Sequence, residues 1–448
     1  MTDQPCALAE PSGQPLSRVI EEALPQPAGS SLDQEVERHY RHNVVVNMLD
    51  GTCFWFGSSF IASRTILPLY VSHLTDSRFL IGLLAVITST GWLLPQLFTA
   101  NWVQRLPRKK VAPVHVGLFT ERLPVLLMVP AAWLATRSPR LALIAFFVLF
   151  AWHAGGAGVV AVGWQDMLAK IIPLDRRGRF FGITNFGGTA TGVLGAAAAA
   201  WLLDRYDFPH GYVLCFAAAT VLIFISWIFL ALTREPAQAS QEPVVSQREY
   251  WRRLPAILRT DGNFRRYLLS QVVLTMGGMG LGFLTVYAVG RWHLPDSQAG
   301  GFTASMLIGQ ALSNLVFGAL SDRRGHKLVL ELSVLLSALA MGLASLAPAP
   351  AWFYAVFALI GASTAGFMLS GIMIVFEFSA PEVRPTYIGL NNTVNGAVAA
   401  VAPMIGGWLA GAMGYRALFA VAFVIGLAGL ALLRWSVREP RRDVRRET

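Results

Sequence analysis

Apolar stretches about twenty residues long recur along almost the entire chain, and they restrict the folds open to it. An α-helix of that length spans about 30 Å, which matches the hydrocarbon core of a bilayer. Only 14% of the 448 residues are charged, well below the roughly 25% of a soluble domain. Because lipid cannot hydrogen-bond the backbone, each segment must satisfy its own amides and carbonyls. The sequence therefore predicts an all-α, multi-pass membrane protein.

Twelve transmembrane helices are predicted, in two groups of six. Their predicted ranges are 43–69, 79–101, 112–135, 141–168, 180–203, 209–232, 264–290, 299–320, 327–347, 352–378, 386–412 and 415–435. The first group makes an N-terminal bundle over 43–232, and the second makes a C-terminal bundle over 264–435. Residues 1–42 and 436–448 are predicted to be cytoplasmic tails, the first flexible and the second basic. The start of the chain lacks the apolar core of a signal peptide.

The segment 233–263 joins the two groups and is the longest polar interruption between spans. Its first part is rich in Pro, Gln and Ser, which favours a flexible linker. Its second part places Trp251 and Leu254 among arginines, a pattern typical of an amphipathic helix on the membrane surface. A solvated basic linker fits the composition equally well, and both interpretations stay open.

The net charge of +10 is distributed unevenly between the two sides of the predicted bundle. With the N-terminus inside, most of the 36 Lys and Arg residues fall on the cytoplasmic side. The outer side has Arg64, Arg78, Arg137, Arg140, Arg205, Arg291 and Arg416. This asymmetry follows the positive-inside rule and predicts that both termini are cytoplasmic. It indicates contact with anionic lipid headgroups of a plasma membrane, in bacteria the inner membrane, and argues against nucleic acid as a partner.

The sequence carries no motif typical of an enzyme. The three cysteines, Cys6, Cys53 and Cys215, lack the spacing of a metal site or a disulfide framework. We find no phosphate-binding glycine loop, HExxH pair or GxSxG turn. We therefore expect neither an enzyme nor ATP-driven transport by this chain alone, and we expect no cofactor and no metal.

Two pairs of short segments repeat between the halves. ANWVQRLPRKK (100–110) follows the second span, and GALSDRRGHKL (318–328) follows the eighth. RRGRFFGITN (176–185) opens the fifth span, and VRPTYIGLNN (383–392) opens the eleventh. Similar segments at equivalent places of two six-span units indicate a parallel repeat, a plan known among secondary transporters.

The chain resembles the major facilitator superfamily over about residues 43–435. The stretch GALSDRRGHK (318–327) carries this resemblance, because it fits the family's loop pattern of Gly, Leu, Asp, Arg, Gly and a base almost position for position. The resemblance implies two pseudo-symmetric six-helix bundles that rock around a central cavity. It also implies that the first, fourth, seventh and tenth spans line that cavity.

The resemblance further implies a gating latch between the two halves. The residues expected to form it are Asp322, Arg323, Gly318, Gly325, Arg177, Arg179 and Gln104. Gly318 is expected to let helices approach closely, and Gly325 to permit the tight turn. Asp322 would then bind the start of the fifth span in the other half. Gln104 takes the place of the aspartate in the matching first-half loop and carries no charge, so we expect a weaker contact there.

Ionisable side chains inside the predicted spans are costly to bury and are candidates for function. Asp50, in the first span, is expected to face the cavity together with Trp55 and Ser59. Glu121 and Arg122 lie near the middle of the third span and point about 100° apart, so at least one is expected to pair with another helix. Asp50 is a candidate partner for Arg122. A structural salt bridge is favoured over a substrate contact for this pair.

Other polar groups lie in the fourth, eighth and tenth spans. His153 is at middle depth, and because imidazole titrates in the physiological range, proton coupling and simple packing are both open. Gln310 and Asn314 are four residues apart and share a helix face, so Gln310 is the preferred neutral contact to a substrate. Asp166 and Glu377 lie near the inner ends of their spans. Asp166 is expected to contribute to a polar cytoplasmic vestibule, and Glu377 to the vestibule and the cavity.

The predicted function is secondary active transport of a small solute by alternating access, carried out by a monomer, with proton coupling left open. A lipid or lysolipid flippase of the same fold is one alternative. A membrane sensor that binds but does not transport is another. The solute and the direction of transport are not predicted, because one fold serves many substrates.

Overall fold

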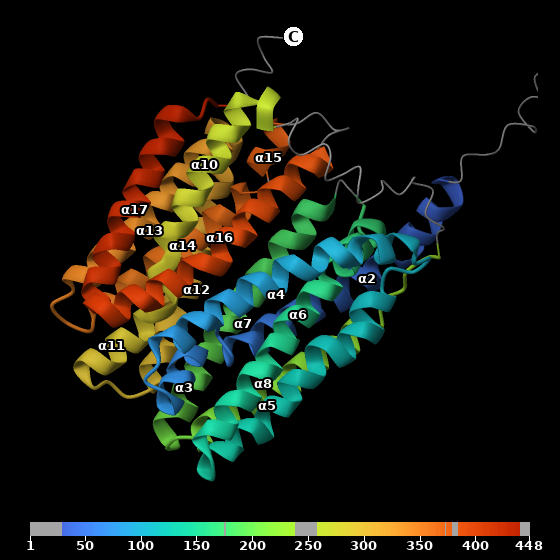
Figure 1. Ribbon diagram of the computed structural model, residues 1–448. Coiled ribbons are helices and arrows are strands. Elements are labelled where there is room, and N and C mark those ends of the chain that lie inside the picture. Colours follow the sequence, from blue (N-terminus) through green and yellow to red (C-terminus); the bar gives the residue numbers. More distant parts are fainter. Residues whose placement is uncertain (1–28, 174–175, 238–257, 372, 379–383, 440–448) are drawn as a thin grey trace, which may run out of the picture.

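A computed structural model describes residues 29–173, 176–237, 258–371, 373–378 and 384–439, and every regular element within these ranges is a helix. The first half contains α2 (Gly29–Ser59), α3 (Ile66–Leu74), α4 (Arg78–Arg105), η1 (Ala112–Val116), η2 (Leu118–Arg122), α5 (Leu123–Trp133), η3 (Leu134–Thr136), α6 (Pro139–Ile171), α7 (Arg177–Arg205) and α8 (His210–Ala231). The second half contains α10 (Gly262–Gly277), η5 (Gly278–Phe283), α11 (Leu284–Trp292), α12 (Ser297–Arg324), α13 (His326–Leu346), α14 (Trp352–Ser370), α15 (Met373–Phe378), α16 (Arg384–Met413) and α17 (Tyr415–Ser436). Figure 1 shows the halves side by side, the first in blue to green and the second in yellow to red.

Eleven helical segments among the described residues are long and apolar enough to cross a membrane. Their order matches the second to the twelfth predicted spans. The first predicted span corresponds to α2 and α3, where Asn43, Asn47 and Asp50 lower the hydropathy. The predicted all-α membrane fold of two six-helix groups is confirmed, with α2 and α3 together supplying the remaining crossing.

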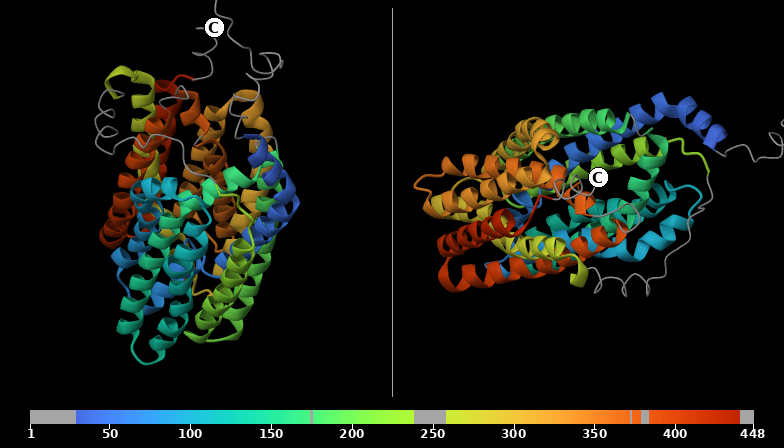
Figure 2. Two further views of the ribbon diagram at one scale, coloured as in Figure 1. Left: turned by 90° about the vertical axis from the view of Figure 1, so that its right-hand side faces the viewer. Right: turned by 90° about the horizontal axis from the view of Figure 1, so that it is seen from above.

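The first span of each half is interrupted at the same end of the molecule. The turn 60–65 separates α2 from α3, and the 3-10 helix η5 separates α10 from α11. α3 packs against α11, at the end of the bundle away from the last residues of α17 (Figures 1 and 2). The continuous helices predicted over 43–69 and 264–290 are wrong at these breaks. The polar run SSFIASRT and the glycine-rich run GGMGLGF disfavour a continuous helix at these points.

The third span is not a regular α-helix along its whole length. Its first part, η1 and η2, is π-helical, and α5 continues it. Short π-helical stretches inside helices are uncommon and are frequent at functional sites. Pro113 and Pro124 lie in the first turns of η1 and α5, where the missing proline N–H disturbs the helix least.

Polar side chains cap and connect helix ends in the second half. Asp261 accepts a hydrogen bond from the Phe264 amide at 2.8 Å and so caps α10. The hydroxyl of Tyr387 donates to Asp261 Oδ2 at 3.1 Å, which joins the start of α16 to the start of α10.

α2 begins at Gly29, well before the predicted start of the first span. Arg176 donates to Glu37 Oε1 at 3.0 Å and lies over the ring of Tyr40, 4.6 Å from its centroid. These contacts hold the extension of α2 against the start of α7. The predicted flexible tail is therefore helical over 29–42. Its remainder, the interfacial helix predicted near Trp251 and the end of the basic C-tail lie outside the described residues.

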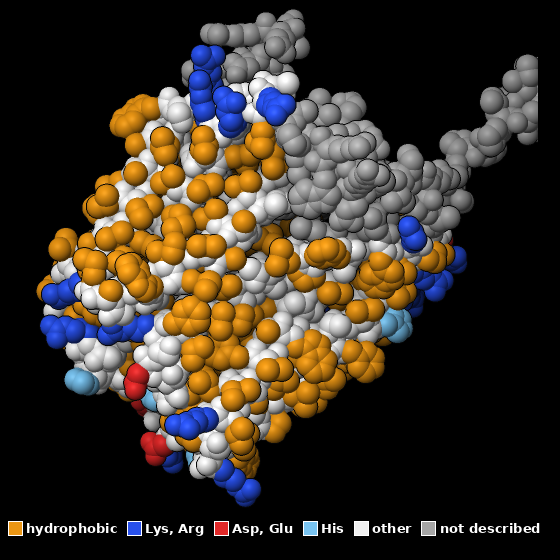
Figure 3. All heavy atoms as spheres, in the orientation of Figure 1, with side chains coloured by type: hydrophobic (Ala, Val, Ile, Leu, Met, Phe, Trp, Pro, Cys, Tyr) orange, Lys and Arg blue, Asp and Glu red, His pale blue; other side chains and the backbone are white. Residues whose placement is uncertain are grey.

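The surface fits a membrane environment. In Figure 3, hydrophobic side chains cover the middle of the visible face over both halves, and Lys and Arg side chains lie toward its ends. Large apolar side chains are well exposed, among them Phe186 at 73%, Leu315 at 76% and Trp408 at 68%. Apolar exposure of this extent is unfavourable in water and favourable against lipid. The protein is a multi-pass membrane protein.

Candidate functional site

The two halves pack through two helix pairs, α4 with α16 and α7 with α12. A glycine in each pair allows the backbones to approach closely. A Cβ atom on Gly82 of α4 would lie 2.7 Å from the backbone oxygen of Pro403 in α16. A Cβ atom on Gly300 of α12 would clash with the backbone oxygen of Ala196 in α7. Both glycines lie near the end of the bundle that α3 and α11 form.

Side chains join the halves at this end, which we call the closed end. The hydroxyls of Thr65 and Thr303 are 2.5 Å apart. His73 Nε2 donates to Asp296 Oδ2 at 2.6 Å, and the hydroxyl of Tyr212 donates to the same oxygen at 2.8 Å. Further hydrogen bonds between the halves at this end join Arg78 to the backbone oxygen of Ala410, and Thr285 to that of Arg64. We call the opposite end, where α7 begins and α12 ends, the far end.

A cavity of about 610 Å³ lies between the two halves. Its wall comes from α2, α4, α6 and α7 of the first half and from α12 and α14 of the second. Trp55, Ser59, His153, Gln310 and Asn314, which were candidates from sequence, all line it. A concave site of this volume, with aromatic and polar walls, suits a small organic molecule.

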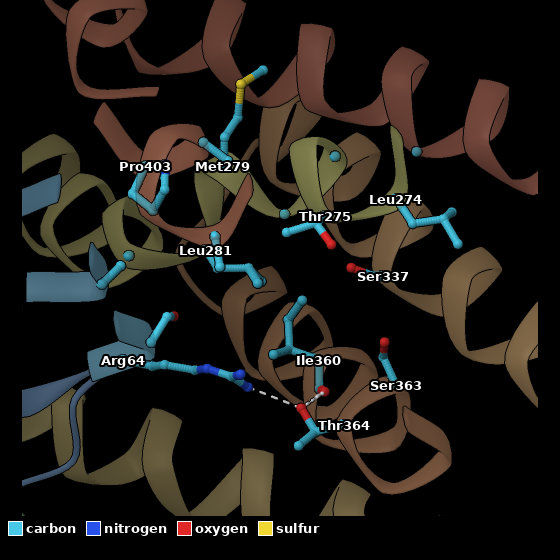
Figure 4. Close-up of a pocket in the computed structure, with 18 of the residues that line it drawn as sticks. Arg64, Leu274, Thr275, Met279, Leu281, Ser337, Ile360, Ser363, Thr364 and Pro403 are labelled. Atoms are coloured by element: carbon cyan, nitrogen blue, oxygen red, sulfur yellow. Dashed lines mark hydrogen bonds between the residues drawn. The ribbon is translucent and has the colours of Figure 1, made fainter. Parts of the chain in front are cut away.

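A second cavity of about 320 Å³ adjoins the first. Ser63, Arg64, Thr88 and Thr364 line both cavities. Arg64 Nη1 donates to the Thr364 hydroxyl at 2.9 Å, so the guanidinium reaches from the first half to the second, as Figure 4 shows. Further polar side chains in the wall of the second cavity are Ser89, Gln271, Thr275, Ser337 and Ser363.

Arg64 is a site residue that the sequence pattern does not reveal. It is predicted among the outer-side charges, but its side chain lies in the wall of both cavities. The turn 60–65 brings it there by ending α2 after Ser59. The one available signal is a polar run, SSFIASRT, inside an otherwise apolar span.

Asp50 lines neither cavity, and its predicted place beside Trp55 in the cavity is wrong. Its side chain is buried inside the first half, and Ser226 of α8 donates a hydrogen bond to Asp50 Oδ1 at 2.6 Å. The carboxylate is therefore turned toward α8 and away from the space between the halves. It makes no ion pair with Arg122 among the described residues.

Glu121 and Arg122 pair with each other, through Arg122 Nη1 and Glu121 Oε2. Each residue is only 4% exposed. The prediction that at least one pairs with another helix is wrong, because the two long side chains reach each other from neighbouring positions in the π-helical turn of η2. The backbone of Glu121 also contacts the fourth span, since His153 Nδ1 donates to the Glu121 backbone oxygen at 2.8 Å. The neutral ring of His153 then has Nε2 as a proton acceptor.

Asp166 and Glu377 lie toward the far end and line neither cavity. The predicted place of Glu377 in the substrate cavity is therefore wrong. Glu377 Oε1 is 4.0 Å from Nε2 of His326, at the start of α13. Asp166 lies close to Lys109, in the loop after α4. Burial lowers the pKa of Lys109, and the negative charge of Asp166 opposes that shift.

The structure describes part of the predicted latch. Gly325 has φ of 94° and forms the turn between α12 and α13, which a side chain would strain. No described atom lies within 4 Å of a Cβ placed on Gly318, so the described residues do not form the close helix approach predicted there in this state. Arg323 is exposed. The side chains of Asp322, Arg177, Arg179 and Gln104 lie outside those the structure describes.

Comparison with known sequences identifies the family. Residues 51–290 and 267–448 match the sequence profile of the Major Facilitator Superfamily. The chain belongs to this superfamily. The loop GALSDRRGHK (318–327) is the family feature that is plainest in the sequence.

This chain is similar to several curated proteins and solved structures. The multidrug resistance protein MdtG of Citrobacter koseri is 23% identical over 421 residues, which are 91% of this chain and 98% of MdtG. The niacin transporter NiaP of Acinetobacter baylyi is 27% identical over 146 residues, 33% of this chain and 32% of NiaP, so that match spans about a third of the relative. The crystal structure of a mutant of the nucleoside transporter NupG has a TM-score of 0.67 at 13% identity, and the match covers 88% of this chain and 99% of the mutant's chain. At this identity the structural likeness shows the fold.

Proposed function

We propose that this chain is a secondary active transporter that moves a small solute across the membrane by alternating access. The central cavity between two six-helix halves, joined by hydrogen bonds at one end, carries this proposal. Those contacts are few and polar, so a rocking motion of the halves breaks them without unfolding either bundle. Opening the closed end while the far end closes would move the cavity's access from one side of the membrane to the other.

The printed names of the relatives support a small solute as the substrate. They include a niacin transporter, a multidrug resistance protein and a nucleoside transporter. Because these solutes differ in chemistry, the names support the class of activity and not one compound.

We assign the far end to the cytoplasm in this proposal, because the segments there carry most of the Lys and Arg residues. The structure then corresponds to an inward-facing state of a protein of the bacterial inner membrane, acting as a monomer. When the far end closes, Asp322 and Arg323 would bind the start of α7, near Arg177 and Arg179. Gln104 would make a weaker contact with the start of α16.

Transport is coupled to protons in this proposal, with His153 as the carrier. The ring lines the cavity, and its Nδ1 is held by the backbone oxygen of Glu121. Nε2 is therefore the atom that accepts a proton when the cavity opens to the side of higher proton concentration.

A cross-link at the closed end tests alternating access. A thermal-shift screen of the purified protein against a panel of solutes first finds a ligand, which is then followed in proteoliposomes. In the Thr65→Cys/Thr303→Cys variant the two sulfurs replace hydroxyls 2.5 Å apart. We expect oxidation to block flux and a reducing agent to restore it, whereas each single cysteine variant transports in both conditions.

Three outcomes would argue for another function. Flux that continues through the oxidised cross-link would contradict alternating access. Binding without flux would indicate a sensor. Movement of a labelled lysolipid, in the absence of solute flux, would indicate a flippase.

A further inference from the structure

Arg64 carries a charge that its surroundings leave without a partner. Its guanidinium has five N–H donors, and among the described residues its side chain has one hydrogen-bond acceptor, the neutral hydroxyl of Thr364. The structure places no carboxylate of a described residue within 4.0 Å of it. A hydroxyl can accept one hydrogen bond but cannot neutralise a positive charge.

The charged side chains that line the cavities are positive, with no negative group among the described residues that line them. Among the described residues that line the two cavities, Arg64 is the only Lys or Arg, and there is no Asp or Glu. His153 is the only other titratable side chain among them. The acids of the neighbouring spans are engaged elsewhere, since Asp50 accepts from Ser226 and Glu121 pairs with Arg122.

Arg64 is only partly exposed. A cation withdrawn from water without a counter-ion is costly, and the cost falls when an anion binds beside it. A carboxylate fits a guanidinium through two parallel hydrogen bonds, which a neutral amide cannot match in strength or geometry. The hydroxyls of Ser63 and Thr88, which line both cavities with Arg64, are further donors on the same wall.

The larger cavity provides a surface for an apolar body next to this charge. Trp55 and Trp92 line it from α2 and α4, and Phe150 lines it from α6. Gly188 allows Trp55 to approach α7 closely, because a Cβ atom there would be 2.7 Å from the indole ring. Aromatic side chains of this kind contact flat or aliphatic groups without a directional requirement.

We propose that the cavity selects small organic anions, with a carboxylate bound by Arg64 and an aromatic or alicyclic body against Trp55 and Trp92. This inference rests on the proposed transport function and names the chemical class of its solute. It also revises the expectation that Gln310 is the main polar contact, because Arg64 provides a charge and the amide of Gln310, on α12, is neutral.

Matched acid and amide pairs test the selectivity without any mutation. Phenylacetate and phenylacetamide have nearly the same shape, as do cyclohexanecarboxylate and cyclohexanecarboxamide, and each pair differs in charge at neutral pH. Binding to the purified full-length protein is measured by tryptophan quenching and by thermal shift. We expect each acid to bind about tenfold or more tightly than its amide.

Variants then assign the preference to one residue. We expect Arg64→Gln to lose about tenfold to a hundredfold in affinity for the acids while leaving the amides unchanged. Arg64→Lys keeps the charge but not the paired geometry, and should retain part of the preference. Arg137→Gln, which removes an exposed arginine from the loop between η3 and α6, is the matched control and should bind as the wild type does.

The outcomes separate this inference from transport itself. Equal binding of acid and amide by the wild type, or binding of neither acid at millimolar concentrations, would overturn the anion assignment, even if Arg64→Gln could not be purified. An acid preference that survives in Arg64→Gln would overturn it as well. The cross-link at Thr65 and Thr303 still decides alternating access in each case, with whichever solute the screen finds.

Discussion

His73 of the first half and Asp296 of the second half lie 2.6 Å apart at the closed end, from Nε2 to Oδ2. Tyr212 of the first half donates to the same carboxylate oxygen at 2.8 Å. One acid of the second half therefore holds two helices of the first, α3 and α8. Because this carboxylate joins two helices of the first half to the second, we expect it to control how readily the closed end opens.

Replacing Asp296 should weaken the closed end. Asp296→Asn removes the negative charge that both donors face, and a charge-assisted hydrogen bond contributes about 1.5–3 kcal/mol. We expect a population with separated halves, measured as a longer distance between spin labels at the exposed positions 137 and 291. Asp207→Asn, at an exposed acid near the same end, is the control and should leave the distance unchanged. An unchanged distance in Asp296→Asn would show that the carboxylate does not hold the end closed.

Adding one methyl group at Gly300 should have a similar effect through packing alone. In Gly300→Ala the new Cβ would meet the backbone oxygen of Ala196, so α12 and α7 cannot approach as they do here. Overpacking of this kind costs about 1–3 kcal/mol, and it acts only on the closed state. Gly290→Ala is the matched control, since no atom lies within 4 Å of a Cβ at that exposed position. The same spin-label pair is measured, and identical distance distributions in the two variants would contradict the packing argument.

The spacing of residues along the sequence predicts several of the side chains that line the larger cavity. Trp55 and Ser59 are four residues apart, as are Gln310 and Asn314, and residues at that spacing share a helix face. All four line the larger cavity. Asp50 is five residues before Trp55, which places it about 140° away around α2 at 100° per residue. The same periodicity that groups the cavity residues therefore separates Asp50 from them.

Other features depend on departures from regular helices, which periodicity does not describe. Arg64 enters the cavity wall because α2 ends at Ser59 and the chain turns before α3. Glu121 and Arg122 pair with each other inside η2, which is π-helical. Hydropathy finds the spans reliably since it averages over about twenty residues, and for the same reason it does not detect a break of six residues or a single wide turn.

Glu121 and Arg122, the buried pair in η2, should contribute to the free energy of unfolding in a strongly non-additive way. Removing one partner leaves an unpaired buried charge, so Glu121→Gln and Arg122→Gln should each cost about 3–5 kcal/mol. The double variant buries no net charge and should cost clearly less than the sum of the two. Unfolding in mixed detergent micelles measures the cycle. Glu37→Gln, at the exposed pair with Arg176, is the control and should cost about 1 kcal/mol or less. Additive costs for Glu121 and Arg122 would mean that the two side chains do not stabilise each other.

If His153 couples transport to protons, its replacement should abolish proton-driven accumulation of the solute but not the binding and exchange of the solute. In His153→Gln the amide can still donate to the backbone oxygen of Glu121, so the orientation of the third and fourth spans is kept while the titrating ring is lost. We expect proteoliposomes with this variant to exchange solute at equal concentrations but to lose the extra accumulation that an imposed proton gradient gives the wild type. His115→Gln, at the exposed histidine of η1, should keep both activities. Exchange needs the cavity and its motion but no net proton movement. Loss of exchange in His153→Gln would therefore mean that the ring has a structural role. Retained gradient-driven accumulation would mean that another group carries the proton.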